Sequence, residues 1–173
     1  MCAIIEAKEV KIVKAIQDIV CYKYYTKNDD GSLRAWFRGH SDTKYKTNEL
    51  YIDEIKFYTT KQEIGARDGK VVESALWKSQ KGFHSAMSLS SCIEMIENKA
   101  RPHSQTNVVI CKCKIPQGSY YAIASEDYNL DLTKLDCYVS ESLFIEKELF
   151  MIKGEDLNTT RKITWTDAAG YTW

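Results

Sequence analysis

The sequence IVCYKYYTKNDDGSLRAWFRG, residues 19–39, carries the clearest structural signal in the chain. Two runs rich in aromatic and β-branched residues, 19–26 and 33–39, flank a turn that contains Asp30 and Gly31. Glycine adopts positive φ without steric cost and aspartate tolerates turns, so this pattern predicts a β-hairpin. The predicted hairpin therefore favours antiparallel strands in the rest of the chain.

The segments on either side of this hairpin predict further strands and few helices. Alternating or apolar runs at 107–115, 120–125 and 138–154 read as strands, and the tail from 161 to 173 could add an edge strand. Residues 88–100 have helical spacing, with Ser88 as the N-cap. The N-terminal residues fit a strand or a helix, and residues 43–80 read as irregular, with long loops. We expect a single α+β domain over residues 1–173, with a mostly antiparallel sheet and few helices.

Composition excludes several classes of protein. The 24 Lys and Arg residues balance 24 Asp and Glu residues, which argues against broad binding to duplex nucleic acid. No apolar run approaches the roughly 20 residues that cross a bilayer, and the N-terminus lacks the pattern of a secretory signal. We therefore expect a cytoplasmic protein without a membrane partner. The six cysteines lack zinc-site spacing, so buried, reduced thiols are expected.

Two short motifs contain candidate ligand-binding side chains. In Gly-Phe-His-Ser, residues 82–85, His84 and Ser85 could project into a cleft, where the imidazole could contact a ribose or a phosphate. Alternatively, both residues form a strand end and the turn before the helix. In AWFRGHSD, residues 35–42, the guanidinium of Arg38 could bind phosphate in a bidentate manner. Alternatively, Arg38 is a solvated residue at a strand end.

A carboxylate and two aromatic residues are the other candidates. Glu141 precedes the apolar core of a strand, where it could hold ribose hydroxyls or stabilise an oxocarbenium-like transition state. Solvated charge is the alternative for Glu141 and the favoured interpretation of Glu146 and Glu148. Tyr120 and Tyr121 could stack on a nucleobase, although core packing is the more frequent role of aromatic residues in strands.

The order of these motifs resembles the arginine–serine–glutamate class of ADP-ribosyltransferases. Those families have an Arg on the first core strand, a Ser-Thr-Ser motif, an Ile-Pro-x-Gly turn and a Glu-x-Glu region. The resemblance implies that Arg38 contacts nucleotide phosphates, that Ser85 occupies the Ser-Thr-Ser position and that Glu141 is the catalytic glutamate. It also implies an ADP-ribosyltransferase-like fold, a pocket completed by His84, and NAD as the donor of ADP-ribose.

Departures from that pattern favour a second hypothesis. HSAMS stands at the Ser-Thr-Ser position and SES at that of Glu-x-Glu, which weighs against transfer more than against nucleotide binding. Residues 81–149 are also similar to small uncharacterised bacteriophage proteins with a Gly-Phe-His-Ser motif, and WFRGHSD is similar to the opening of FRG domains. The alternative is a non-catalytic phage protein that evades host defence by sequestering a nucleotide signal or by blocking a host protein through its aromatic surface.

Overall fold

The computed structural model describes residues 3–7, 10–35, 43–60, 75–98, 107–126, 135–153 and 166–167. These ranges contain fourteen strands and one helix. In chain order they are β1 (Ala3–Ala7), β2 (Val13–Lys14), β3 (Ile19–Lys27), β4 (Leu33–Ala35), β5 (Lys44–Tyr45), β6 (Glu49–Ile52), β7 (Lys56–Thr60), β8 (Ala75–Lys81), β9 (Phe83–Ala86), α1 (Leu89–Asn98), β10 (Val108–Ile115), β11 (Tyr120–Glu126), β12 (Leu135–Ser140), β13 (Ser142–Ile152) and β14 (Thr166–Asp167).

The expected α+β fold class is wrong. The described part of the chain is mostly antiparallel β-sheet with the single short helix α1. The error lies mainly in residues 43–80, which we interpreted as irregular and which contribute β5, β6, β7 and β8. Their strand signals are short and mixed with polar residues, because most of these strands bury little of their surface. The tail adds β14, which pairs with β13 as an edge strand.

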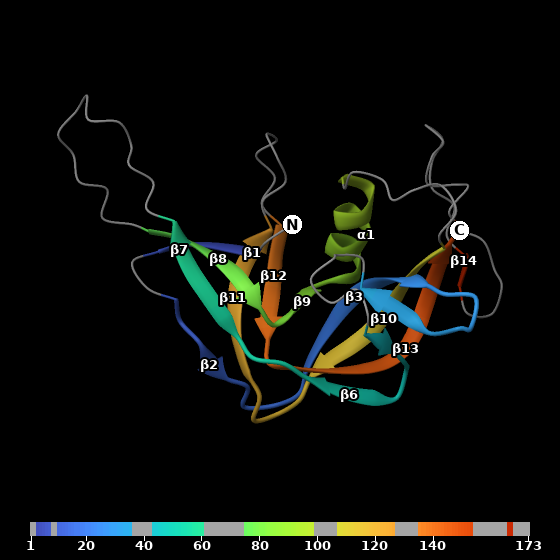
Figure 1. The fold of residues 1–173 in the computed structure, drawn as a ribbon, viewed down its shortest axis with the longest axis horizontal. Helices are drawn as coiled ribbons and strands as arrows, with labels where there is room; N and C mark the ends of the chain where they lie inside the picture. Colours follow the sequence, from blue (N-terminus) through green and yellow to red (C-terminus); the bar gives the residue numbers. More distant parts are fainter. Residues whose placement is uncertain are drawn as a thin grey trace.

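All the strands belong to one antiparallel sheet. Its main path runs β14-β13-β10-β3-β9-β12-β11-β1-β8-β7, while β2 joins β11, β4 joins β3, β5 joins β4 and β6 joins β13. The sheet curves around α1, which packs on β3, β9 and β12 (Figure 1). Register shifts in the β10–β13 ladder at Ile110/Cys111 and Lys112/Cys113 interrupt regular pairing, and such bulges bend a sheet.

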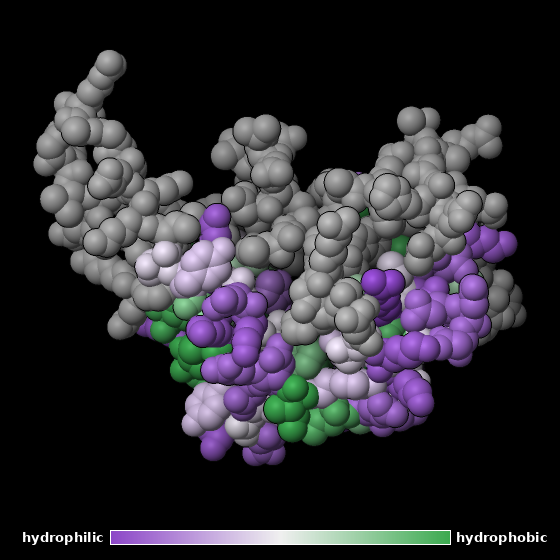
Figure 2. Space-filling view, viewed as in Figure 1, coloured by the Kyte–Doolittle hydropathy of each residue, from purple (hydrophilic) through white to green (hydrophobic). Residues whose placement is uncertain are grey.

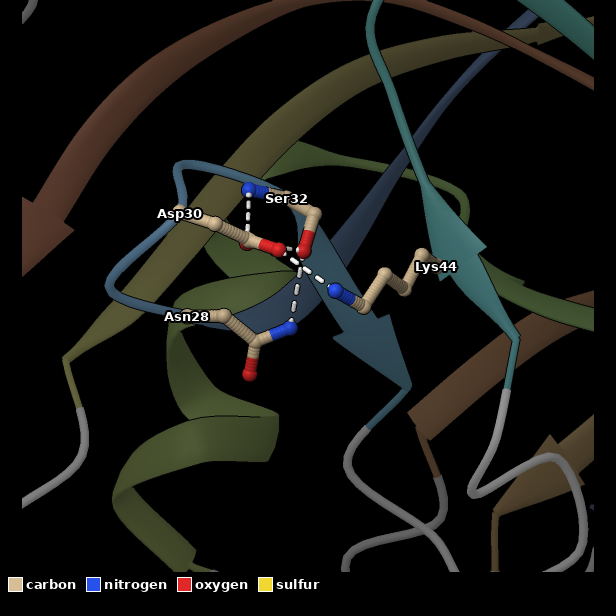
Figure 3. Close-up of polar contacts among 4 residues, drawn as sticks. All are labelled: Asn28, Asp30, Ser32 and Lys44. Atoms are coloured by element: carbon tan, nitrogen blue, oxygen red, sulfur yellow. Dashed lines mark hydrogen bonds and ion pairs between the residues drawn. The ribbon is translucent and has the colours of Figure 1, made fainter.

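The predicted hairpin is confirmed over residues 19–35, where β3 pairs with β4. Gly31 takes the positive φ of 82° that its turn requires. The Asp30 carboxylate accepts hydrogen bonds from the backbone N–H and the hydroxyl of Ser32, and it pairs with the Lys44 ammonium from β5 (Figure 3). The hydrogen bonds from Lys44 and Ser32 lower the pKa of Asp30. One aspartate thus ties the turn to the next strand.

The helix begins where the sequence predicts. The Ser88 hydroxyl accepts the backbone N–H of Ser91 at 3.1 Å, which is the N-cap hydrogen bond. Cys92, Met95 and Ile96 then face the sheet, following the helical spacing of apolar residues. Within the described ranges, no helix is long and apolar enough to span a membrane.

The two faces of β10 belong to two different hydrophobic cores. Val108 and Ile110 pack in the core beneath α1, whereas Val109, Cys111 and Cys113 pack in a second core on the other face. The second core is closed by residues of β4, β5 and β13 and by Phe83 of β9. Successive side chains of a strand point to opposite faces, so a strand buried on both faces shows an apolar run in place of alternation.

The helix leaves part of its own face of the sheet uncovered. Val20, Lys114, Phe144 and Leu50 are aligned across β3, β10, β13 and β6, on the face that carries Ile110. Leu50 and Ile52 of β6 are 51% and 75% exposed. Hydrophobic surface gathers at the lower edge of the molecule around β6, among hydrophilic residues (Figure 2).

Candidate functional site

Glu141 lies in the bend between β12 and β13, and its backbone is held on both sides. Its N–H donates to the carbonyl of Tyr120 at 3.1 Å, and its carbonyl accepts the N–H of Asp53 at 2.7 Å. Both peptide groups of the bend are therefore satisfied by neighbouring segments. The position of the Glu141 side chain follows from a fixed backbone and not from a mobile loop tip.

The carboxylate of Glu141 is anchored through one oxygen. Oε1 accepts the backbone N–H of Tyr120 at 2.9 Å, and the side chain is half-buried. Oε2 has no hydrogen-bond partner within the described residues. A charged acceptor held by one oxygen keeps the other available for a donor from a ligand.

Tyr120, whose backbone N–H holds this carboxylate, pairs with Lys14 of β2. Tyr120 is 46% exposed and stands directly opposite Lys14 in the β11–β2 ladder. The Lys14 Nζ lies 5.8 Å from the centroid of the Tyr120 ring, within cation–π range. The backbone of Ala15 exchanges hydrogen bonds with Gly118 and Ser119, which secures β2 against the start of β11. We call the group of Lys14, Tyr120 and Glu141 the Tyr120–Glu141 corner.

His84 occupies a different environment on β9. Its Nε2 lies 2.7 Å from the hydroxyl of Ser79 on β8, and its backbone carbonyl accepts a hydrogen bond from the Lys23 ammonium at 2.6 Å. His84 is half-buried and pairs in register with Val139 of β12. The hydroxyl of Ser79, which is buried on the preceding strand β8, therefore orients the imidazole.

Ser85 points to the opposite face of β9. It pairs in register with Tyr138 and is 3% exposed. Its Oγ makes no hydrogen bond of standard geometry within the described residues, and its polar neighbour is the Cys21 thiol. Burial raises the pKa of Cys21 to about 11, against smaller opposing effects of the Ser85 hydroxyl and the Lys23 ammonium.

Tyr121 packs on the same side as Ser85. Its ring meets that of Tyr138 edge to face, with centroids 5.7 Å apart and an interplanar angle of 83°. Both tyrosines pack against the second core. Adjacent residues of a strand point to opposite faces, so the rings of Tyr120 and Tyr121 lie on opposite faces of β11.

The predicted site residues therefore fall into three places. Tyr120 and Glu141 share a hydrogen bond, His84 meets Ser79, and Ser85 and Tyr121 border the second core. Arg38 lies outside the described residues.

Sequence reasoning missed two residues that shape the Tyr120–Glu141 corner. Lys14 reaches it through the short strand β2, and Asp53 supports it from the connection between β6 and β7. Asp53 also accepts the backbone N–H of Gly82 through Oδ2 at 3.3 Å, so it links three segments. Neither residue belongs to a motif, and only the pairing of distant strands brings them to Glu141.

Comparison of the chain with family models, with curated proteins and with solved structures gives no significant match.

Proposed function

We propose that the protein binds a nucleotide of the NAD or ADP-ribose type at the Tyr120–Glu141 corner. The observation that carries this proposal is the hydrogen bond from the backbone N–H of Tyr120, a residue with an exposed ring, to the Glu141 carboxylate. An aromatic face suits stacking of a base, a carboxylate oxygen suits hydroxyl donors of a ribose, and an ammonium suits phosphate. Tyr120 of β11 and Lys14 of β2 supply the ring and the ammonium from paired strands, and Glu141 supplies the carboxylate from the bend between β12 and β13.

The proposed function is binding without transfer of ADP-ribose. The corner contains one carboxylate, that of Glu141, and Ser140 stands in the first position of the Ser-Glu-Ser stretch that replaces Glu-x-Glu. Ser140 is buried and donates its hydroxyl to the carbonyl of Ser142 at 2.9 Å, so it supports the bend. A phage origin, as expected from residues 81–149, would extend the proposal to sequestration of a host nucleotide signal.

Isothermal titration calorimetry of the full chain with NAD, ADP-ribose and cyclic nucleotides tests this proposal. We expect Tyr120→Ala to weaken binding by about 1–3 kcal/mol, the value of one base–aromatic stack. Glu141→Gln should also weaken binding, because it replaces a charged acceptor with a neutral one. Tyr58→Ala is the matched control, since Tyr58 is 42% exposed on β7, which β1 and β8 separate from β11.

Two results would count against the proposal in different ways. Absence of binding to every nucleotide tested, or equal losses in Tyr120→Ala and Tyr58→Ala, would overturn the assignment of the site. Mass spectrometry of the ligand recovered after denaturing the protein separates binding from chemistry. Intact nucleotide supports sequestration, whereas released nicotinamide would show that the protein cleaves NAD.

A further inference from the structure

Two buried cysteines face each other across the centre of the sheet. Cys21 of β3 and Cys113 of β10 are register partners, and neither is exposed. The N–H of Lys27 donates to the carbonyl of Asn107 in the same ladder, so alternate pairs along it, including Cys21 with Cys113, are hydrogen-bonded pairs. Such pairs have Cα atoms about 5.5 Å apart. Disulfides usually span about 4.4–6.8 Å between Cα atoms, but opposed Cβ atoms of a hydrogen-bonded pair lie about 5.5 Å apart, wider than the roughly 3.5–4.5 Å of a relaxed disulfide. A bridge at this register would therefore be strained and readily reduced.

Cys111 is a poorer partner for either thiol. It lies on the same face as Cys113, two residues away along β10, and its own register partners are Lys23 and Glu148. Two residues of a strand separate parallel Cβ atoms by about 6.6–6.8 Å, whereas a disulfide needs about 3.5–4.5 Å. The directly opposed pair, Cys21 and Cys113, therefore has the smallest Cβ separation among these three cysteines.

The hydroxyl of Ser85 supplies a second, independent observation. It is buried beside Cys21 and has no hydrogen bond of standard geometry within the described residues. A hydroxyl in that place can donate to a thiolate, and the nearby Lys23 ammonium favours the same charge. Burial raises the pKa of Cys113, and the neighbouring thiols of Cys21 and Cys111 raise it further. Because the Ser85 hydroxyl lies beside Cys21, Cys21 is assigned as the attacking thiol.

We propose that Cys21 and Cys113 are a redox pair that forms a reversible disulfide between β3 and β10. The Cys21 thiolate attacks a sulfur of a small disulfide, which releases one small thiol and leaves a mixed disulfide. Cys113 then attacks Cys21 Sγ, and the second small thiol leaves. The two protein thiols lose two protons and two electrons, and the small disulfide gains them as two thiols. Because both sulfurs are buried, the reaction proceeds through local opening of the sheet and is slow.

The test uses the full chain and the neutral reagent 2-hydroxyethyl disulfide under native conditions. After blocking of the remaining thiols in denaturant, peptide mapping should show Cys21 joined to Cys113, with dithiothreitol reversing the link. Cys111→Ser should form the same link, and Ser85→Ala should form it several-fold more slowly.

The proposal fails if native oxidation leaves Cys21 and Cys113 unlinked, if either one is joined to another cysteine, or if the link forms only in denaturant. An equal oxidation rate in Ser85→Ala and the wild type would overturn the role of Ser85. The mapping of the wild-type chain needs no substitution, so the test does not depend on the folding of any variant.

Discussion

At the residue scale, the charged carboxylate of Asp30 stabilises the hairpin. Its carboxylate accepts two hydrogen bonds from Ser32 and pairs with Lys44, and these contacts lower its pKa (Figure 3). A group whose pKa is lower in the folded state contributes stability above its unfolded pKa, near 3.8, and loses it as pH falls. We expect Asp30→Asn to lower the free energy of unfolding at pH 7 and to show a smaller difference from the wild type at pH 3. Urea denaturation at both pH values measures the effect.

Asp29→Asn is the control for that experiment. Asp29 is an exposed neighbour in the same turn. Its substitution should change stability little at either pH, because surface substitutions away from specific contacts are usually neutral. Equal losses in the two variants would mean that the general charge of the turn, and not the Asp30 contacts, stabilises the hairpin.

At the scale of elements, Gly82 allows the junction of β8 and β9 to pack closely against β12. It has a φ of 112°, and an added Cβ would lie 2.8 Å from Val139 Cγ1 and 3.3 Å from the Ser140 carbonyl oxygen. We expect Gly82→Ala to lower the free energy of unfolding by at least about 1–3 kcal/mol, the cost of a strained backbone, with overpacking in addition. The change should also weaken nucleotide binding, because the Gly82 N–H contacts Asp53, which supports Glu141.

Gly118→Ala separates strain from overpacking. Gly118 has a similar positive φ of 87°, but the nearest atom to its added Cβ is Lys14 Cε at 3.9 Å. Its loss of stability in chemical denaturation should therefore be smaller than that of Gly82→Ala. A loss as large as that of Gly82→Ala would show that the contact with Val139 and Ser140 contributes little.

At the scale of the whole molecule, the core beneath α1 joins the two halves of the chain. Met95, 2% exposed, packs in a cluster with residues of β1, β3, β9, β10, β11, β12 and β13. We expect Met95→Ala to cost about 2–5 kcal/mol, and fluorescence and circular dichroism should report the same unfolding midpoint. Ile16→Ala is the control, because Ile16 is 87% exposed. Separate midpoints for the two signals would contradict a single cooperative core.

Local patterns were enough to predict several elements before any contact was known. The hairpin at residues 19–35, the helix capped by Ser88 and the strands β10 and β11 follow from turn chemistry, capping and hydrophobic patterning. The predicted reduced, buried thiols are confirmed for the five described cysteines, and Cys2 lies outside the described residues. Each of these features depends on residues that are close in sequence, so the sequence alone was enough to predict them.

Sheet order, and with it the site, depends on pairing between distant segments. The register of β12 with β9 decides which face of β9 carries His84 and which carries Ser85. The register of β11 with β2 places Lys14 opposite Tyr120. Because side chains alternate with a period of two, a shift of one residue would exchange the faces of a whole strand. The motifs could therefore name Tyr120 and Glu141 as candidates, whereas their meeting with Lys14 and the placement of Ser85 against Cys21 arise from packing that no local pattern encodes.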